Sequence, residues 1–156
     1  MHECRLRLDA LEADLLVYCD KDPYAEGVHR LCCYRGVNTI GALTLVSEVC
    51  DWRRFAKASS FMGFVGDFRR SELFACIHAK SSDLPATRWR CYQSGPFVGP
   101  RIRRAQEQCP PATAERAWAA QVRLCGRFRR LAARKNVKSV VVTAVARELA
   151  GFLWGR

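Results

Sequence analysis

Residues 34–42 read YRGVNTIGA and separate two stretches of the chain that have helical spacing. Gly36 can adopt the left-handed backbone conformation that a tight turn requires. Asn38 tolerates the same conformation better than most residues, because its short polar side chain can bond locally. Gly41 and Ala42 are small, so the helix that contains them can pack closely on its neighbour. The stretch therefore predicts a tight hairpin between two packed helices.

Capping residues and apolar spacing predict where the helices on either side of this hairpin begin and end. Asp22 can cap the first helix and Pro23 is favoured at its first position, so this helix should run to about Cys33. The second helix should span about residues 39–49, and a short helical turn should follow at residues 51–55. The apolar face of the second helix should consist of Ile40, Leu43, Val46 and Val49.

Helical spacing recurs through most of the remaining chain, and this predicts an all-α fold. Ser59 or Ser60 should cap one more helix after the turn. Residues 67–96 show no regular period and should be irregular. Three helices are expected beyond them, over about residues 100–108, 113–134 and 137–154.

The long helix predicted over residues 113–134 begins with Thr113 as its cap and has an apolar and a basic face. The apolar face should contain Trp118, Val122, Cys125, Phe128 and Leu131 or Ala132. The basic face contains Arg116, Arg123, Arg127, Arg130 and Arg134. The preceding helix adds Arg101, Arg103 and Arg104. Because residues 101–135 include only Glu107 and Glu115 as acids, few local ion pairs are expected, which favours a polyanionic partner over a merely solvated face.

Residues 5–19 are predicted to form a helix with an apolar stripe of Leu8, Leu11, Leu15 and Tyr18. Two heptads are too few to be stable alone. The segment is typical of the end of a coiled coil or of an arm that packs on a neighbour, and an ordinary amphipathic core helix is the alternative. The chain then divides into this arm (residues 1–22), a hairpin block (23–66), an irregular segment (67–96) and basic C-terminal helices (97–156).

Charge is distributed unevenly along the chain, which has a net charge of +11. Residues 1–26 carry three basic and seven acidic side chains, whereas residues 101–156 carry thirteen and three. Most of the cations are arginines, whose guanidinium groups suit phosphate. The basic end therefore predicts contact with nucleic acid.

Other classes of protein are disfavoured by the sequence. It contains no secretory signal and no membrane span, so we expect a cytoplasmic protein without membrane contact. The nine cysteines form no CxxC pair, and the three histidines have no ligand spacing. Buried, reduced thiols are therefore favoured over a zinc or redox module, and we predict no metal site.

The hairpin around residues 34–42 resembles that of the helix-hairpin-helix DNA-binding motif. Free backbone N–H groups at the start of its second helix can bind a phosphate without reading base sequence. The candidate DNA-binding residues of this hairpin are Arg35, Gly36, Val37, Asn38, Thr39 and Gly41. An ordinary helix–helix turn with a steric need for glycine is the alternative.

Catalytic patterns are missing from the sequence. Two-metal phosphoryl transfer needs several converging carboxylates, but the acidic residues here lie mainly on the first helix or are isolated. No Ser/His/Asp arrangement and no phosphate-binding glycine loop stands out. We therefore expect binding, and not catalysis, within this chain.

Two blocks of the chain resemble the C-terminal domain of insertion-sequence transposases of the one-ten/one-sixteen/nine-oh-two family. The first block, residues 24–66, contains LCCYRGVNTIGAL at 31–43 and FMGFVG at 61–66. The second block, residues 97–154, contains AWAAQ at 117–121 and AVARELAGFLW at 144–154. Together they cover about two thirds of the chain.

This resemblance implies a larger architecture for the family. Members have an N-terminal RuvC-like nuclease domain with acidic ligands for Mg²⁺, a coiled coil, and then a helical domain that brings a nucleophilic serine. They act as DNA recombinases, and some are guided by a structured RNA. On this resemblance residues 5–19 are the tail of the coiled coil and allow self-association. The partners are DNA and a guide RNA, while Mg²⁺ belongs to a nuclease domain that precedes this region and is absent from the sequence.

The chain departs from the family after residue 66. Members carry a Ser-Glu-x-Ser-Ser-Gly-like segment there, whereas this chain has Ser71-Glu72 followed by LFAC at 73–76. Ser71 is the nearest positional match, but no catalytic serine is assigned, and residues 67–95 are interpreted as a frameshifted segment. We therefore expect part of a transposase that binds DNA but lacks chemistry alone. The alternative is a stand-alone, non-enzymatic helix-hairpin-helix protein that binds nucleic acid.

Overall fold

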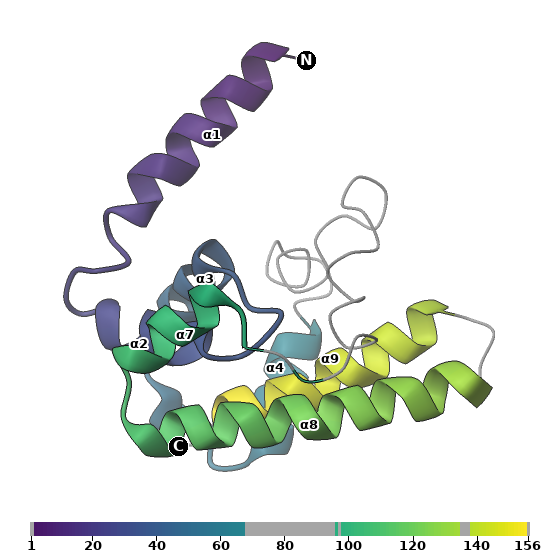
Figure 1. Ribbon diagram of the computed structural model, residues 1–156. Helices are drawn as coiled ribbons and strands as arrows, with labels where there is room; N and C mark the ends of the chain where they lie inside the picture. Colours follow the sequence, from purple (N-terminus) through teal and green to yellow (C-terminus); the bar gives the residue numbers. More distant parts are fainter. Residues whose placement is uncertain (1, 68–95, 97, 135–137, 156) are drawn as a thin grey trace.

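The computed structural model describes residues 2–67, 96, 98–134 and 138–155, and within these residues every regular element is a helix (Figure 1). The all-α prediction is therefore confirmed. The predicted irregular segment lies outside the described residues apart from Asp67 and Pro96. The elements are α1 (His2–Leu16), α2 (Ala25–Cys32), α3 (Thr39–Val49), a 3-10 turn (Trp52–Arg54), α4 (Ala58–Asp67), α7 (Pro100–Glu107), α8 (Pro111–Arg134) and α9 (Lys138–Trp154).

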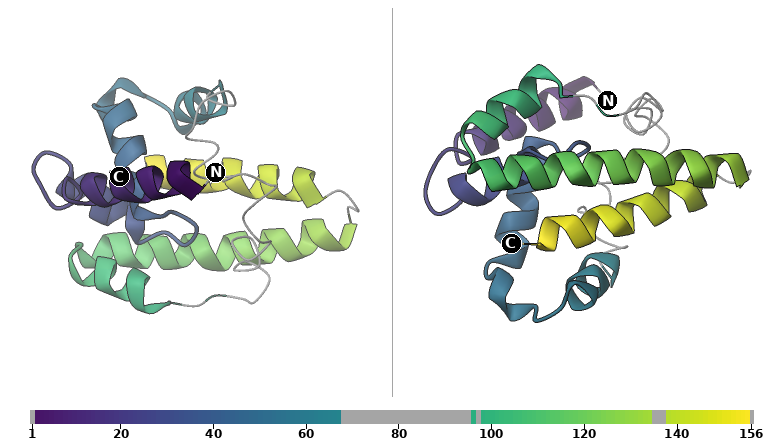
Figure 2. Two further views of the ribbon diagram at one scale, coloured as in Figure 1. Left: turned by 90° about the horizontal axis from the view of Figure 1, so that it is seen from above. Right: turned by 60° about the horizontal axis from the view of Figure 1, so that its bottom comes forward.

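The two longest helices of the body, α8 and α9, lie side by side and run in opposite directions (Figures 1 and 2). Helix α4 packs on α9, while α2 packs on both α3 and α7. One cluster of buried residues runs through all these helices, and its largest fully buried members include Leu31, Phe61, Leu124 and Leu149. The two blocks of the sequence therefore share a single core.

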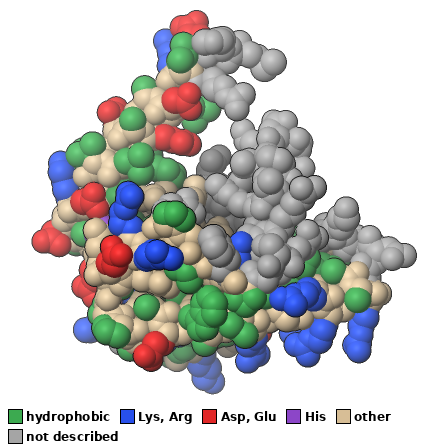
Figure 3. Space-filling model, in the orientation of Figure 1, with side chains coloured by type: hydrophobic (Ala, Val, Ile, Leu, Met, Phe, Trp, Pro, Cys, Tyr) green, Lys and Arg blue, Asp and Glu red, His purple; other side chains and the backbone are tan. Residues whose placement is uncertain are grey.

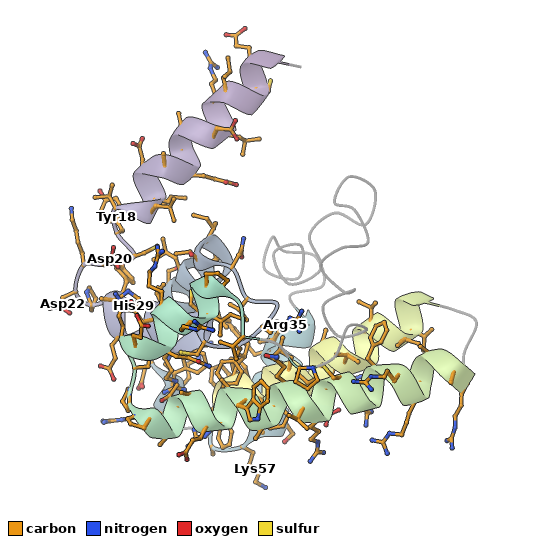
Figure 4. All side chains as sticks on the ribbon, viewed as in Figure 1. Tyr18, Asp20, Asp22, His29, Arg35 and Lys57 are labelled. Carbon is orange, nitrogen blue, oxygen red and sulfur yellow. The ribbon has the colours of Figure 1, made fainter. Side chains whose placement is uncertain are left out.

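Helix α1 projects away from this body (Figure 1). The four residues of its predicted stripe are between 43% and 60% exposed, and Tyr18 lies beyond the end of the helix. The alternative of an ordinary core helix is therefore wrong for this segment. A turn follows, in which Asp20 Oδ1 is 2.9 Å from His29 Nε2 of α2 (Figure 4). That residues 5–19 form an arm that packs on a neighbour remains a prediction.

Three predicted helix caps are wrong, although most predicted helix spans are close to those observed. Helix α2 begins at Ala25 after an uncapped Tyr24, so Asp22 does not cap it. Ser59 and Ser60 lie inside α4, and Thr113 lies inside α8. In each case a backbone carbonyl one turn earlier already accepts the first helical N–H groups, as Pro110 does from Thr113 at 2.9 Å. Pro111 suits the first position of α8 because its φ angle is fixed near the helical value.

The apolar face of α8 is rotated from its predicted position. Trp118 and Val122 were expected in the core but are 44% and 46% exposed. The buried residues instead follow spacings of three, one, three, one and three along the helix. They are Ala117, Ala120, Gln121, Leu124, Cys125 and Phe128. Small alanines at the contact let neighbouring helices approach closely, which a large Trp or Val there would prevent.

Candidate nucleic-acid interface

The hairpin between α2 and α3 has the turn that the sequence predicts at Gly36. Its φ angle is 99°, in the left-handed region that glycine occupies without steric cost. Val37 lies in the core at 5% exposure. The left-handed prediction for Asn38 is wrong, since its φ and ψ angles are −97° and 166°. Extended backbone at this position makes Asn38 the N-cap of α3.

This cap determines which amides of α3 remain for a ligand. The Asn38 Oδ1 atom accepts a hydrogen bond from the Gly41 N–H at 2.9 Å. The Asn38 carbonyl accepts from the Ala42 N–H at 2.8 Å. The N–H groups of Thr39 and Ile40 have no partner among the described residues. The predicted phosphate contact of Gly41 is therefore replaced by an internal bond, and two amides are left at the helix start.

Helices α2 and α3 approach each other tightly at Gly27, a residue that sequence reasoning missed. A Cβ atom there would lie 2.9 Å from Val46 Cγ2, so no larger side chain fits without movement. Gly41 and Ala42 are both buried as expected. A glycine inside a helical stretch, with no role in a turn, is the sequence signal that could have revealed Gly27.

Arg35 is half-buried and faces the body of the protein near α8 (Figure 4). Burial raises the pKa of the Cys125 thiol of α8, and the nearby guanidinium groups of Arg35 and Arg129 partly oppose that rise. Arg35 therefore interacts electrostatically with α8 within the protein, whether or not it also binds a ligand.

The predicted arginine stripe of α8 divides into three groups. The first is Arg116 at the start of the helix, which is half-buried and whose Nη1 donates to the Gly155 carbonyl at 2.6 Å. It shares the end of α9 with Arg30, whose Nη2 donates to the Leu153 carbonyl at 3.3 Å, and with Tyr34, whose hydroxyl donates to the Phe152 carbonyl at 3.3 Å. These donors satisfy carbonyls that a helix C-terminus leaves unpaired.

The second group, in the middle of α8, contacts Glu148 of α9. Arg123 Nε donates to one carboxylate oxygen of Glu148, and Arg127 Nε lies 2.9 Å from the other oxygen. Few local ion pairs were predicted for the stripe, and at these two positions the partner is a non-local acid. The antiparallel packing of α8 and α9 brings in an acid that lies outside residues 101–135, where local counting could not find it.

The third group consists of exposed arginines near the end of α8. Arg130 and Arg134 belong to the predicted stripe, and the neighbouring Arg129 was missed. None of the three forms an ion pair with the described residues. Lys and Arg side chains line the edge of the molecule along α8 (Figure 3). Arg103 and Arg104 are likewise exposed on α7, whereas the side chains of Arg101 and Ser71 lie outside the described residues.

An open groove of about 910 Å³ lies between α4, α8 and α9. Its walls include Met62, Arg123, Arg127, Arg147, Glu148 and Phe152. Arg147 and Phe152 were not among the predicted site residues. Among the described residues no group of three His, Cys, Asp or Glu side chains could hold a metal ion. In the same part of the chain, no helix combines the length and apolar character needed to cross a membrane.

Comparison with known proteins relates this chain to a transposase. The chain is 36% identical over 130 residues to the protein named "Putative transposase y4qE" from Sinorhizobium fredii. The alignment covers 77% of this chain and 33% of that protein, so the chain spans about a third of the length of this curated relative. No protein-family model matches the chain. No solved structure matches it either. The chain is thus a homologue of one part of a transposase, and this agrees with the resemblance seen in its sequence.

Proposed function

We propose that this chain is the DNA-binding part of an insertion-sequence transposase and does not cut or join DNA by itself. The observation that carries the proposal is the group of exposed arginines at the end of α8, Arg129, Arg130 and Arg134. They have no acidic partner among the described residues, so their charge is available to a polyanion. The similarity to a transposase supports DNA as that polyanion.

Contact with DNA would be made mainly to the phosphate backbone. Each guanidinium offers a planar fork of N–H donors to a phosphate, and every phosphate neutralised adds ~0.9 to the salt slope of duplex binding. Arg103 and Arg104 of α7 are two further exposed cations, on a helix that packs beside α2 and away from the end of α8 (Figure 1). The N–H groups of Thr39 and Ile40, which have no partner among the described residues, provide a further phosphate position at the start of α3. Such contacts position DNA and carry little sequence information.

The finer assignment is to the one-ten/one-sixteen/nine-oh-two family of insertion-sequence transposases. In that assignment α1, with exposed Leu8, Leu11 and Leu15, is the end of a coiled coil through which chains associate. Mg²⁺ would bind to a nuclease domain, because the described residues of this chain offer no fitting cluster of carboxylates. A structured guide RNA is the second nucleic-acid partner of this proposal.

Titration of a fluorescent DNA duplex at several salt concentrations tests DNA binding. The triple change Arg129→Ala, Arg130→Ala and Arg134→Ala should lower the salt slope by about two to three. The matched control is Lys21→Ala, Arg53→Ala and Lys57→Ala, which removes three exposed cations elsewhere in the molecule (Lys57 is labelled in Figure 4). An equal loss in both variants would show that net charge, and not the end of α8, binds DNA.

A stand-alone, non-enzymatic helix-hairpin-helix protein is the second candidate function. The left-handed Gly36 favours it, as do the two N–H groups at the start of α3 that have no partner among the described residues. Reading the DNA upstream of this coding region separates the two candidates. A neighbouring frame that encodes a nuclease domain supports the transposase, and its absence supports the stand-alone protein.

A further inference from the structure

The groove between α4, α8 and α9 combines positive charge with an apolar wall. Among the described residues, Arg123, Arg127 and Arg147 line it together with a single acid, Glu148, so this part of the lining has an excess of two positive charges. The apolar wall is formed by Met62 of α4 and Phe152 of α9, which are both half-buried. The two kinds of surface face one open space, which distinguishes the groove from the exposed end of α8.

Glu148 fixes how two of these arginines are presented. Its side chain is only 14% exposed, and it contacts the Nε edge of each guanidinium, with a hydrogen bond from Arg123 and an ion pair with Arg127. The NH₂ groups of both guanidiniums have no partner among the described residues. The carboxylate therefore holds two forks side by side with their donor-rich edges free, an arrangement that suits the oxygens of phosphates.

The apolar wall limits the kind of nucleic acid that fits. In a duplex the faces of the bases are stacked inside, so a duplex can offer only its backbone and groove edges to such a wall. An unpaired base has a free face that can stack on an aromatic ring. The Arg123 guanidinium lies over one face of the Phe152 ring, 5.9 Å from its centre, so charge and aromatic surface lie within one nucleotide of each other and a base would stack on the rest of the ring or on the guanidinium plane.

We propose that this groove binds an unpaired nucleic-acid strand, with phosphates on Arg127 and Arg147 and a base against Phe152 and Met62. The proposal rests on the proposed function, since it assumes that the chain binds nucleic acid. It adds a second surface with a different substrate: duplex DNA binds at the end of α8, and a single strand binds in the groove. DNA and RNA strands share the required phosphates and base faces.

The test compares binding of labelled oligothymidine and oligouridine of about twelve nucleotides with binding of a duplex. Phe152→Leu keeps apolar bulk but removes the aromatic face, and it should raise the Kd for single strands by about fivefold or more. Arg147→Ala changes an exposed side chain and should lower the single-strand salt slope by about 0.7. Neither variant should change the Kd for the duplex by more than about twofold, within surface-mutation effects.

The control is the triple alanine change at residues 129, 130 and 134, which should weaken duplex binding more than single-strand binding. Equal effects of Phe152→Leu on single strands and duplex, or no effect of either groove variant on single strands, would overturn the proposal. If only oligothymidine responds, the strand is DNA, and if only oligouridine responds, it is RNA. A chain that binds the duplex but no single strand contradicts this inference alone, whereas a chain that binds neither contradicts the proposed function.

Discussion

The two ends of α8 carry the same residue type in different settings. At its start, Arg116 is half-buried and donates to the last part of α9 together with Arg30 and Tyr34. At its end, Arg130 and Arg134 are exposed and have no acidic partner among the described residues. An arginine stripe in a sequence is therefore not one functional unit. The part next to a helix C-terminus stabilises the fold, and the part beyond the packed region is available to a ligand.

The difference follows from where unpaired backbone groups lie. The last carbonyls of α9 have no helical partner, and a positively charged donor satisfies them and interacts favourably with the negative end of the helix. Arg134 lies in the last turn of α8 itself, and among the described residues neither Arg130 nor Arg134 donates a hydrogen bond to another helix, so both remain solvated.

The largest effect is expected at the start of α8. Arg116→Ala removes a charge-assisted hydrogen bond to the Gly155 carbonyl and should lower the free energy of unfolding by about 1.5–3 kcal/mol. Arg134→Ala, the matched change at the exposed end, should stay within about 0.5 kcal/mol of the original protein. Urea denaturation followed by circular dichroism measures both. If the two variants have the same stability, the two ends do not differ in the way described.

A smaller effect is expected in the middle of the helix. Glu148→Gln removes the charge that holds Arg123 and Arg127, and should lower the free energy of unfolding by about 1 kcal/mol. One more positive charge is then left unneutralised on this pair of arginines, so the salt slope of duplex binding should rise by about 1. Titrations at several salt concentrations test this. An unchanged slope would show that Arg123 and Arg127, like Arg116, stabilise the fold and do not contact DNA.

The buried groups around the start of α8 should leave the folding stability unchanged at neutral pH and lower it at alkaline pH. Burial raises the pKa of the Cys33 thiol from 9.0 to about 12, with smaller contributions from Cys109 and Cys32. Burial likewise raises the pKa of Tyr34, and this rise is opposed by Arg116 and Arg30. Between pH 9 and pH 12 the unfolded Cys33 thiol loses its proton while the folded one keeps it. Stability that is complete below pH 9 should therefore fall as pH rises through this window.

Denaturation in a series of alkaline buffers measures that fall. Cys33→Ala should make the loss of stability between pH 9 and pH 12 less steep. Cys4→Ala provides the control, because Cys4 is exposed on α1. An identical pH profile for Cys33→Ala and the original protein would show that this thiol does not contribute to the alkaline loss.

The sequence predicted the features that depend on local spacing. The bounds of α3, the short turn after it and the extent of α7 and α9 all follow from runs of apolar residues and from Pro and Gly positions. The left-handed turn at Gly36 was also predicted, because only a residue without a side chain adopts that conformation at no cost. These features require information from only a few neighbouring residues.

Features that depend on tertiary packing were predicted less well. The predicted core face of α8 is confirmed at Cys125 and Phe128 but wrong at Trp118 and Val122, where close helix packing selects the alanines beside them. Glu148 was missed as a partner of two arginines because it lies on the next helix, 25 residues after Arg123. The groove requires α4, α8 and α9 together, so no single stretch of sequence could reveal it.

The contact between Gly27 and Val46 limits how the hairpin block can evolve. A single added methyl group at position 27 would meet the Val46 side chain at 2.9 Å, in a place where both helices are already fixed by the core. The two positions therefore cannot vary independently: a larger residue at 27 requires a smaller one at 46. Across related chains this physical constraint should be visible as covariation of the pair, even though the two residues are far apart in sequence.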